Sequence, residues 1–144
     1  MKILVLLSLL WFQTVHALDT KGMKSHGGAL IEGVEPVHAF EYMSDQEKNY
    51  LILQKEIGRK GNSAIWENVN HLLIPQIDIE DSLFYALCNY KGTFEPKIVA
   101  IAKYEEEKEL NAIVKKAWIA DIEKGQFVSI PVKNIECINE AYGL

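Results

Sequence analysis

AWIADIEKGQFVSI, residues 117–130, carries the clearest structural signal in this chain. Two runs rich in apolar residues flank Glu123-Lys124-Gly125, and Gly125 suits the left-handed backbone position of a tight turn. Pro131 ends the second run, because a proline has no amide proton to donate to a neighbouring strand. This stretch therefore predicts a β-hairpin with strands at 117–122 and 126–130.

Further strands are expected on either side of this hairpin. Residues 83–90 and 97–104 are short runs that are apolar on both alternating faces, as is typical of inner strands, and residues 135–138 form a short last strand. The segment 104–116 has apolar residues that fit a helical spacing, and it also has a strand parity that continues into the hairpin. We expect a strand from about residue 112.

The preceding part of the chain predicts two helices. Ser44-Asp45-Gln46-Glu47 forms a capping-box pattern before a run with helical spacing, which predicts a helix over 45–57 that ends at Gly58. After a linker at 59–62, Ser63 can cap a second helix, which Pro75 limits to about Leu73. Five apolar residues would share one stripe of that second helix: Ile65, Trp66, Val69, Leu72 and Leu73.

Together these signals predict an α+β fold, with an N-terminal helical hairpin packed on a curled antiparallel β-sheet of four to five strands. The expected single domain covers residues 37–144, and the Gly-rich residues 18–36 are expected to form a flexible arm. Residues 1–17 have the layout of a secretory signal peptide: Lys2, a short apolar run, and small residues before a cut at Leu18. That apolar run is too short to span a bilayer, which needs about 20 residues.

Cys88 and Cys137 predict one structural disulfide, because an exported chain with two cysteines pairs them in an oxidising compartment. The bond would close a loop of about 50 residues and stabilise the fold by roughly 4 kcal/mol. In a flat five-strand meander the two cysteine strands would lie about 19 Å apart, whereas a disulfide needs Cα atoms within about 7 Å. Either the sheet curls strongly, or the last segment doubles back beside the strand that holds Cys88.

Charge and composition narrow the classes of partner. The net charge is −5, and loss of the leader with its Lys2 makes it more negative, which argues against nucleic acid as a partner. No second apolar stretch is long enough for a membrane span. We therefore expect a soluble, secreted or periplasmic protein whose partner is an unknown protein or small ligand.

The sequence contains no recognisable catalytic, metal-binding or cofactor-binding motif, so no catalytic residue, metal ligand or cofactor is assigned. The three acidic residues of Asp78-Ile79-Glu80-Asp81 are expected in a solvated loop. Trp118 is expected in the core, but an exposed indole after Lys115 and Lys116 could bind a cationic or sugar partner. Lys115, Lys116 and Trp118 are therefore the candidate binding residues.

These observations favour a non-catalytic binding or inhibitory protein over an enzyme. One alternative is a small hydrolase that uses His71 or scattered carboxylates. A further alternative is a structural subunit of an envelope assembly.

Overall fold

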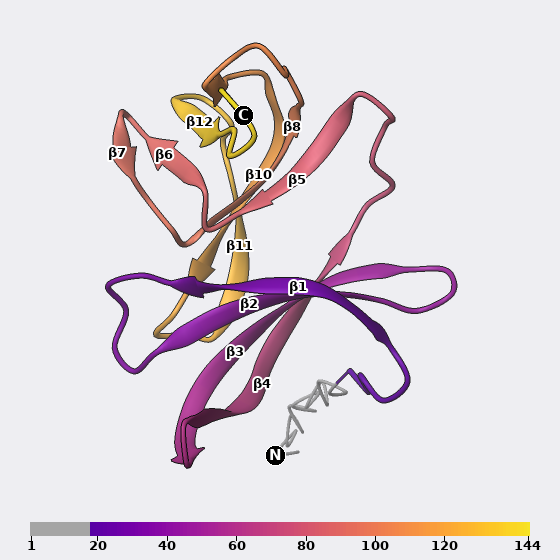
Figure 1. Ribbon diagram of the computed structural model, residues 1–144, viewed down its shortest axis with the longest axis vertical. Coiled ribbons are helices and arrows are strands. Elements are labelled where there is room, and N and C mark those ends of the chain that lie inside the picture. Colours follow the sequence, from indigo (N-terminus) through magenta and orange to yellow (C-terminus); the bar gives the residue numbers. More distant parts are fainter. Residues whose placement is uncertain (1–17) are drawn as a thin grey trace, which may run out of the picture.

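The computed structural model describes residues 18–144, so the predicted signal peptide at 1–17 lies outside the described residues. The described chain consists of twelve β-strands in three four-stranded antiparallel sheets and contains no helix (Figure 1). The predicted α+β class is therefore wrong, and the chain is all-β. No helix long and apolar enough to cross a membrane occurs among residues 18–144.

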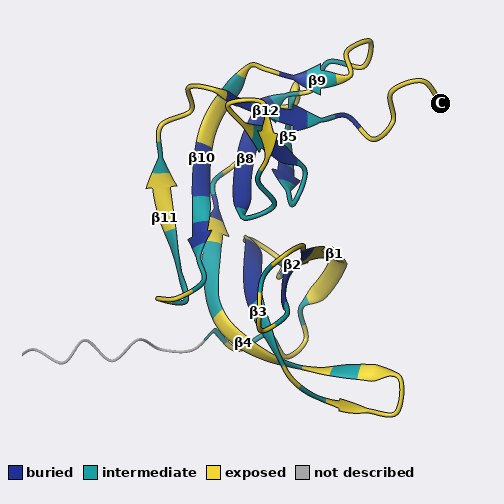
Figure 2. Cartoon of the chain, turned by 90° about the vertical axis from the view of Figure 1, so that its left-hand side faces the viewer, coloured by how far each residue is buried: buried dark blue, intermediate teal, exposed yellow. Residues whose placement is uncertain are grey.

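The first sheet, sheet A, is a meander in which each strand pairs with the next along the chain. Its strands are β1 (Lys24–Ile31), β2 (His38–Ser44), β3 (Asn49–Lys60) and β4 (Ser63–Ile74). Residues 18–36, which we expected to form a flexible arm, thus contain the edge strand β1. The residues that we expected to form two helices instead form the long hairpin β3–β4. The tip of this hairpin projects from the body of the molecule and is exposed (Figure 2).

The capping-box pattern at 44–47 instead closes the turn between β2 and β3. The Asp45 carboxylate accepts hydrogen bonds from the backbone N–H groups of Glu47 and Lys48, at 2.8 and 2.6 Å. These two bonds stabilise the charged carboxylate and lower the pKa of Asp45. The same short polar side chains serve helix caps and turns, so this local signal does not distinguish the two structures.

The helical spacing in β4 has its cause in a β-bulge. Asn68 pairs with Gln54 and Asn70 pairs with Leu53, which leaves Val69 as an extra residue. Beyond a bulge, the residues that share one face of a strand change from odd to even numbers. Ile65 and Leu72 therefore share one face of β4, and Trp66 and Leu73 share the other. Each pair is seven residues apart, a spacing that also fits a helix.

The central sheet, sheet B, has the strand order β11-β10-β8-β5. Its strands are β5 (Asp81–Tyr85), β8 (Ile98–Lys103), β10 (Val114–Asp121) and β11 (Gln126–Ile130). The predicted hairpin at 117–130 is confirmed, with Asp121 opposite Gln126, and so is the predicted strand at 97–104. The expected continuous strand at 83–90 is instead two strands, because the backbone turns at Ala86, where φ is 56°.

Sheet C is small and contains the disulfide. Its strands, in spatial order, are β7 (Thr93–Phe94), β6 (Cys88–Tyr90), β12 (Ile135–Ile138) and β9 (Leu110–Asn111). Cys88 and Cys137 lie directly opposite each other in β6 and β12 and form the predicted disulfide, with an S–S distance of 2.11 Å. The last strand therefore doubles back beside the strand of Cys88, which is one of the two predicted topologies.

Sheet B contributes to both hydrophobic cores. One face of sheet B, which includes Val99 and Trp118, packs against buried residues of sheet A. The opposite face, which includes Ile98 and Ala117, packs around the disulfide of sheet C. Strand β8, in which residues 98–102 are all buried, is accordingly the most buried of the described strands (Figure 2). A strand covered on both faces must be apolar at odd and even positions alike, which explains the sequence of residues 98–102.

Candidate functional site

Three residues other than glycine have a left-handed backbone in the part of the chain that the structure describes. They are Ala86, Lys91 and Asn134, with φ angles of 56°, 50° and 65°. Such conformations are unfavourable for residues with a side chain and concentrate at binding and active sites. Lys91 and Asn134 line one cleft, and Ala86 lines another.

The cleft at Lys91 and Asn134 has a volume of about 420 Å³, and we call it the lysine cleft. Its apolar surface comes from sheet B and the residue that follows it: Ile98, Ile119, Ile130 and Pro131. Its polar surface comes from the β6–β7 turn, the β7–β8 connection and the loop before β12: Tyr90, Lys91, Glu95, Lys133 and Asn134. The cleft thus combines an apolar surface with a few charged groups, as small-molecule sites do.

Backbone hydrogen bonds hold the walls of the lysine cleft in place. The Lys91 N–H donates to the Asn134 carbonyl at 2.9 Å and so joins the two loops. The Glu95 N–H donates to the carbonyl of Cys88, also at 2.9 Å. Because Cys88 is bonded to Cys137 in the neighbouring strand, the disulfide and these bonds fix both walls to one framework.

The charges around the lysine cleft are predominantly positive. The Lys91 Nζ lies 5.3 Å from the centre of the Tyr90 ring, at a distance typical of a cation–π contact. Glu95 is the one acidic residue of the lining, and its Oε1 lies 3.9 Å from the Nζ of Lys97. Neither Lys91 nor Lys133 forms an ion pair within residues 18–144. Both amines are therefore available to an anionic group.

Two of the three candidate binding residues from the sequence, Lys116 and Trp118, come together in the structure, whereas Lys115 lies apart from them. Trp118 is only 7% exposed and belongs to the core between sheets A and B, with the Lys116 Nζ 5.5 Å from its ring centre. Lys116 and Trp118 line a groove of about 680 Å³ beside the end of β4. Lys115 instead forms ion pairs with Asp81 at 2.9 Å and Glu80 at 3.2 Å.

Only part of the acidic segment 78–81 therefore forms the solvated loop that we expected. The Asp81 side chain is 3% exposed, and the amine of Lys115 balances its negative charge. The pKa of Lys115 is raised, first by its hydrogen bond to Asp81 and then by its hydrogen bond to Glu80. These residues hold β5 to the start of β10.

The described histidines lie apart from one another. His71 on β4 lies edge-on to Tyr50, with ring centres 5.7 Å apart. His26 on β1 contacts Ser44 on β2, with Nε2 2.6 Å from Oγ. No group of three or more His, Cys, Asp or Glu side chains that could hold a metal ion is present among residues 18–144.

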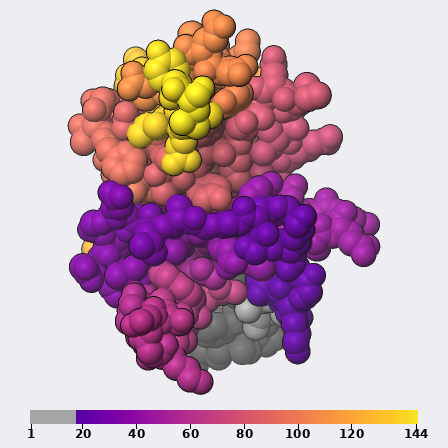
Figure 3. Space-filling model, viewed as in Figure 1, coloured from indigo at the N-terminus to yellow at the C-terminus, as the bar shows by residue number. Residues whose placement is uncertain are grey.

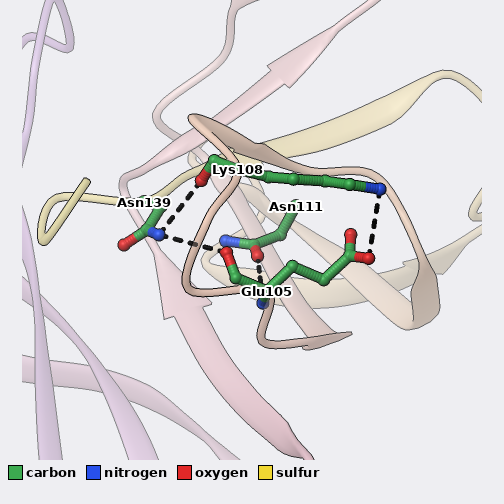
Figure 4. Close-up of polar contacts among 4 residues, drawn as sticks. All are labelled: Glu105, Lys108, Asn111 and Asn139. Carbon is green, nitrogen blue, oxygen red and sulfur yellow. Dashed lines mark hydrogen bonds and ion pairs between the residues drawn. The ribbon is translucent and has the colours of Figure 1, made fainter. Parts of the chain in front are cut away.

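A buried polar cluster closes the turn between β8 and β9 (Figure 4). The Asn139 amide donates to the carbonyls of Glu105, Glu106 and Lys108 at 3.2, 3.3 and 3.0 Å. Asn111 accepts a hydrogen bond from the Glu105 N–H at 2.8 Å. All of these polar groups form hydrogen bonds within the protein, so the cluster stabilises this turn.

Our sequence analysis missed the residues of the lysine cleft. The Lys91-Gly92 and Pro131 positions are recognisable as strand ends, but nothing local places residues 90–95 against residues 130–134. That proximity depends on the register in which β6 and β12 pair, with Cys88 opposite Cys137.

Comparison of the chain with protein-family models, with curated proteins and with solved structures found no match.

Proposed function

We propose that this is a non-catalytic binding protein of an oxidising compartment outside the cytoplasm, and that the lysine cleft holds its ligand. The ligand class is a small amphipathic anion, with an apolar body and one carboxylate, sulfonate or similar group. The location rests on the disulfide, since structural disulfides persist in secreted and periplasmic proteins.

The observation that carries this proposal is a cleft lined both by an apolar surface and by two lysines, Lys91 and Lys133, that form no ion pair within residues 18–144. An apolar body in contact with Ile119 and Ile130 would lose its contact with water, which favours binding. An anionic end group would meet the amines of Lys91 and Lys133 at the polar wall. The rigid backbone of the walls would limit the entropy lost when a ligand binds.

Isothermal titration calorimetry of the full chain with decanoate tests the proposal. Decanoate should bind, and decyltrimethylammonium, which has the same apolar body and the opposite charge, should bind at least tenfold more weakly, a difference of about 1.4 kcal/mol. The double variant Lys91→Gln, Lys133→Gln should lose most of the decanoate affinity.

The matched control is Lys60→Gln, Lys124→Gln, which removes the same charge from two turns outside the lysine cleft. This control should bind decanoate as the unmodified chain does. Equal binding of the anion and the cation, or equal loss of affinity in both double variants, would refute the assignment of the cleft.

A further inference from the structure

Strand β1 forms one edge of sheet A and pairs only with β2 among the described strands. The backbone groups on its outer side have no ladder partner there, and such an edge is a template for an additional strand. In Figure 3 the indigo residues of this region cross the middle of the molecule, next to the residues of sheet C above them. This edge lies at the surface.

The second half of β1 lacks the features that normally protect an open edge. The bulge in this strand lies between Ser25 and Gly27, and pairing from Gly28 to Ile31 is regular. The sequence there is GALI, without a charge or a proline. Proteins usually block exposed edges with bulges, lysines or prolines, so an unblocked apolar edge indicates a pairing surface.

A groove of about 700 Å³ runs between this edge and the start of sheet C. Leu30 and Phe94 both line it and are 59% and 41% exposed. Ala86, one of the three residues with a left-handed backbone, also lies in its wall. The groove therefore offers apolar contacts next to unpaired backbone groups.

The groove is acidic. Its charged lining residues are Glu32, just after β1, and Glu140, just after β12. Neither of them forms an ion pair within residues 18–144. A second copy of this chain would bring two more carboxylates to the groove, whereas a basic segment would neutralise those present.

We propose that the β1 edge from Gly28 to Ile31 binds an extended, basic segment of a partner protein as an additional strand of sheet A. Backbone hydrogen bonds to β1 supply the register, apolar side chains of the segment contact Leu30 and Phe94, and its Lys or Arg residues pair with Glu32 and Glu140. This surface is separate from the lysine cleft, and it does not depend on the function proposed for that cleft.

Three capped peptides of one length test this proposal against the full chain: an alternating Lys/Val peptide, its Glu/Val counterpart, and the Lys/Val peptide with N-methylated backbone amides. The Lys/Val peptide should bind and shift the backbone amide NMR signals of Gly28–Ile31. The Glu/Val and N-methylated peptides should each bind at least tenfold more weakly, since one lacks the charge and the other the donors.

The variants are Leu30→Lys, which blocks the edge, and Glu32→Lys with Glu140→Lys, which reverses the charge of the groove. Each should weaken Lys/Val binding at least tenfold, whereas Glu123→Lys in the β10–β11 turn should leave it unchanged. Lys91→Gln with Lys133→Gln should also leave it unchanged, so that failure of the lysine cleft and failure of the edge are distinguishable.

Two results would overturn the proposal. One is equal binding of the three peptides, which would exclude backbone pairing and charge recognition. The other is self-association in sedimentation that Leu30→Lys abolishes, together with no peptide binding, which would make a second copy the occupant of the edge.

Discussion

Asn139 shows how a single buried side chain can define a turn. It follows β12, is 5% exposed, and donates to three backbone carbonyls of the 105–108 turn. Figure 4 shows two of these bonds, to the carbonyls of Glu105 and Lys108. Its Oδ1 also accepts a hydrogen bond from the Ala141 N–H at 3.1 Å. The turn has no Gly, Pro or Asn of its own at 105–109, so this distant residue replaces the usual local signals.

Replacement of Asn139 by Ala should lower the free energy of unfolding by about 2–3 kcal/mol, because buried carbonyls lose their donor. Asn139→Asp should be at least as destabilising at pH 7, where a carboxylate faces those carbonyls, and it should recover partly in acid. Urea unfolding measures both effects, with the exposed Asn68→Ala as the control, expected within about 0.5 kcal/mol. A change of similar size in all three variants would contradict the structural role of Asn139.

Tyr85 makes the stability of the fold sensitive to alkaline pH. Burial raises the pKa of Tyr85 above 10.0, and the charges of Tyr42 and Glu140 contribute to the same direction. At a pH between the pKa of the unfolded state and the higher pKa of the folded state, the phenol is protonated in the folded chain and ionised in the unfolded chain. The free energy of unfolding therefore falls as pH rises above about 10.

Tyr85→Phe should reduce this alkaline loss of stability, while Tyr90→Phe, at an exposed tyrosine, should not. Melting temperatures from pH 8 to pH 11 measure the difference. Parallel pH profiles for the Tyr85→Phe variant and the unmodified chain would show that Tyr85 does not titrate in this way.

At the scale of elements, the β10–β11 turn connects sheet B to sheet A. Gly125 has a φ of 60° in this turn, and a Cβ on it would lie 2.7 Å from a methyl carbon of Val69 in β4. The Gly125 carbonyl accepts a hydrogen bond from the Asn70 side chain at 3.0 Å. The predicted hairpin is therefore also the contact point between two layers.

Gly125→Ala should cost about 2 kcal/mol, from the left-handed backbone and from the collision with Val69. The comparison is Gly92→Ala, with a φ of 78° and open space around it, which should show only the backbone cost of about 1 kcal/mol. In a double-mutant cycle, Val69→Ala should recover part of the Gly125→Ala loss but none of the Gly92→Ala loss. Strict additivity of Gly125→Ala and Val69→Ala would refute the contact.

How far each element can be predicted from sequence depends on how local its signal is. The strands at 97–104, 117–122 and 126–130 are short apolar runs bounded by Pro or Gly residues, so their signals act within a few positions, and they were predicted. The β3–β4 hairpin was not, because bulges at Ile57 and Val69 break its alternation into helical spacing. Its two-residue Gly61-Asn62 turn was a usable signal that we interpreted as a linker.

At the scale of the whole molecule, sheets A and C pack on the central sheet B, and sheet C is the least able to persist alone. Its four strands are only two to four residues long. Such short strands bury little surface, so the Cys88–Cys137 bond is their main constraint. The cysteine pair could be predicted from sequence, whereas the cleft beside it could not, since its walls meet only in the folded chain.

Replacement of both cysteines by Ala should lower the free energy of unfolding by about 4 kcal/mol. Hydrogen exchange should accelerate most at Asn89 and Glu136 of sheet C and least in sheet A. Calorimetry of the variant, and of the unmodified chain with and without reductant, gives the comparison. An unchanged melting temperature would show that sheet C does not depend on the bond.

The most direct test of the proposed function is an amide NMR titration of the isotopically labelled full chain with decanoate. The account predicts saturable shifts at Lys91, Ile119, Ile130 and Asn134, with little change at Gly28–Ile31. The absence of shifts at the lysine cleft, or saturable shifts centred on Lys116 and Trp118 instead, would contradict it.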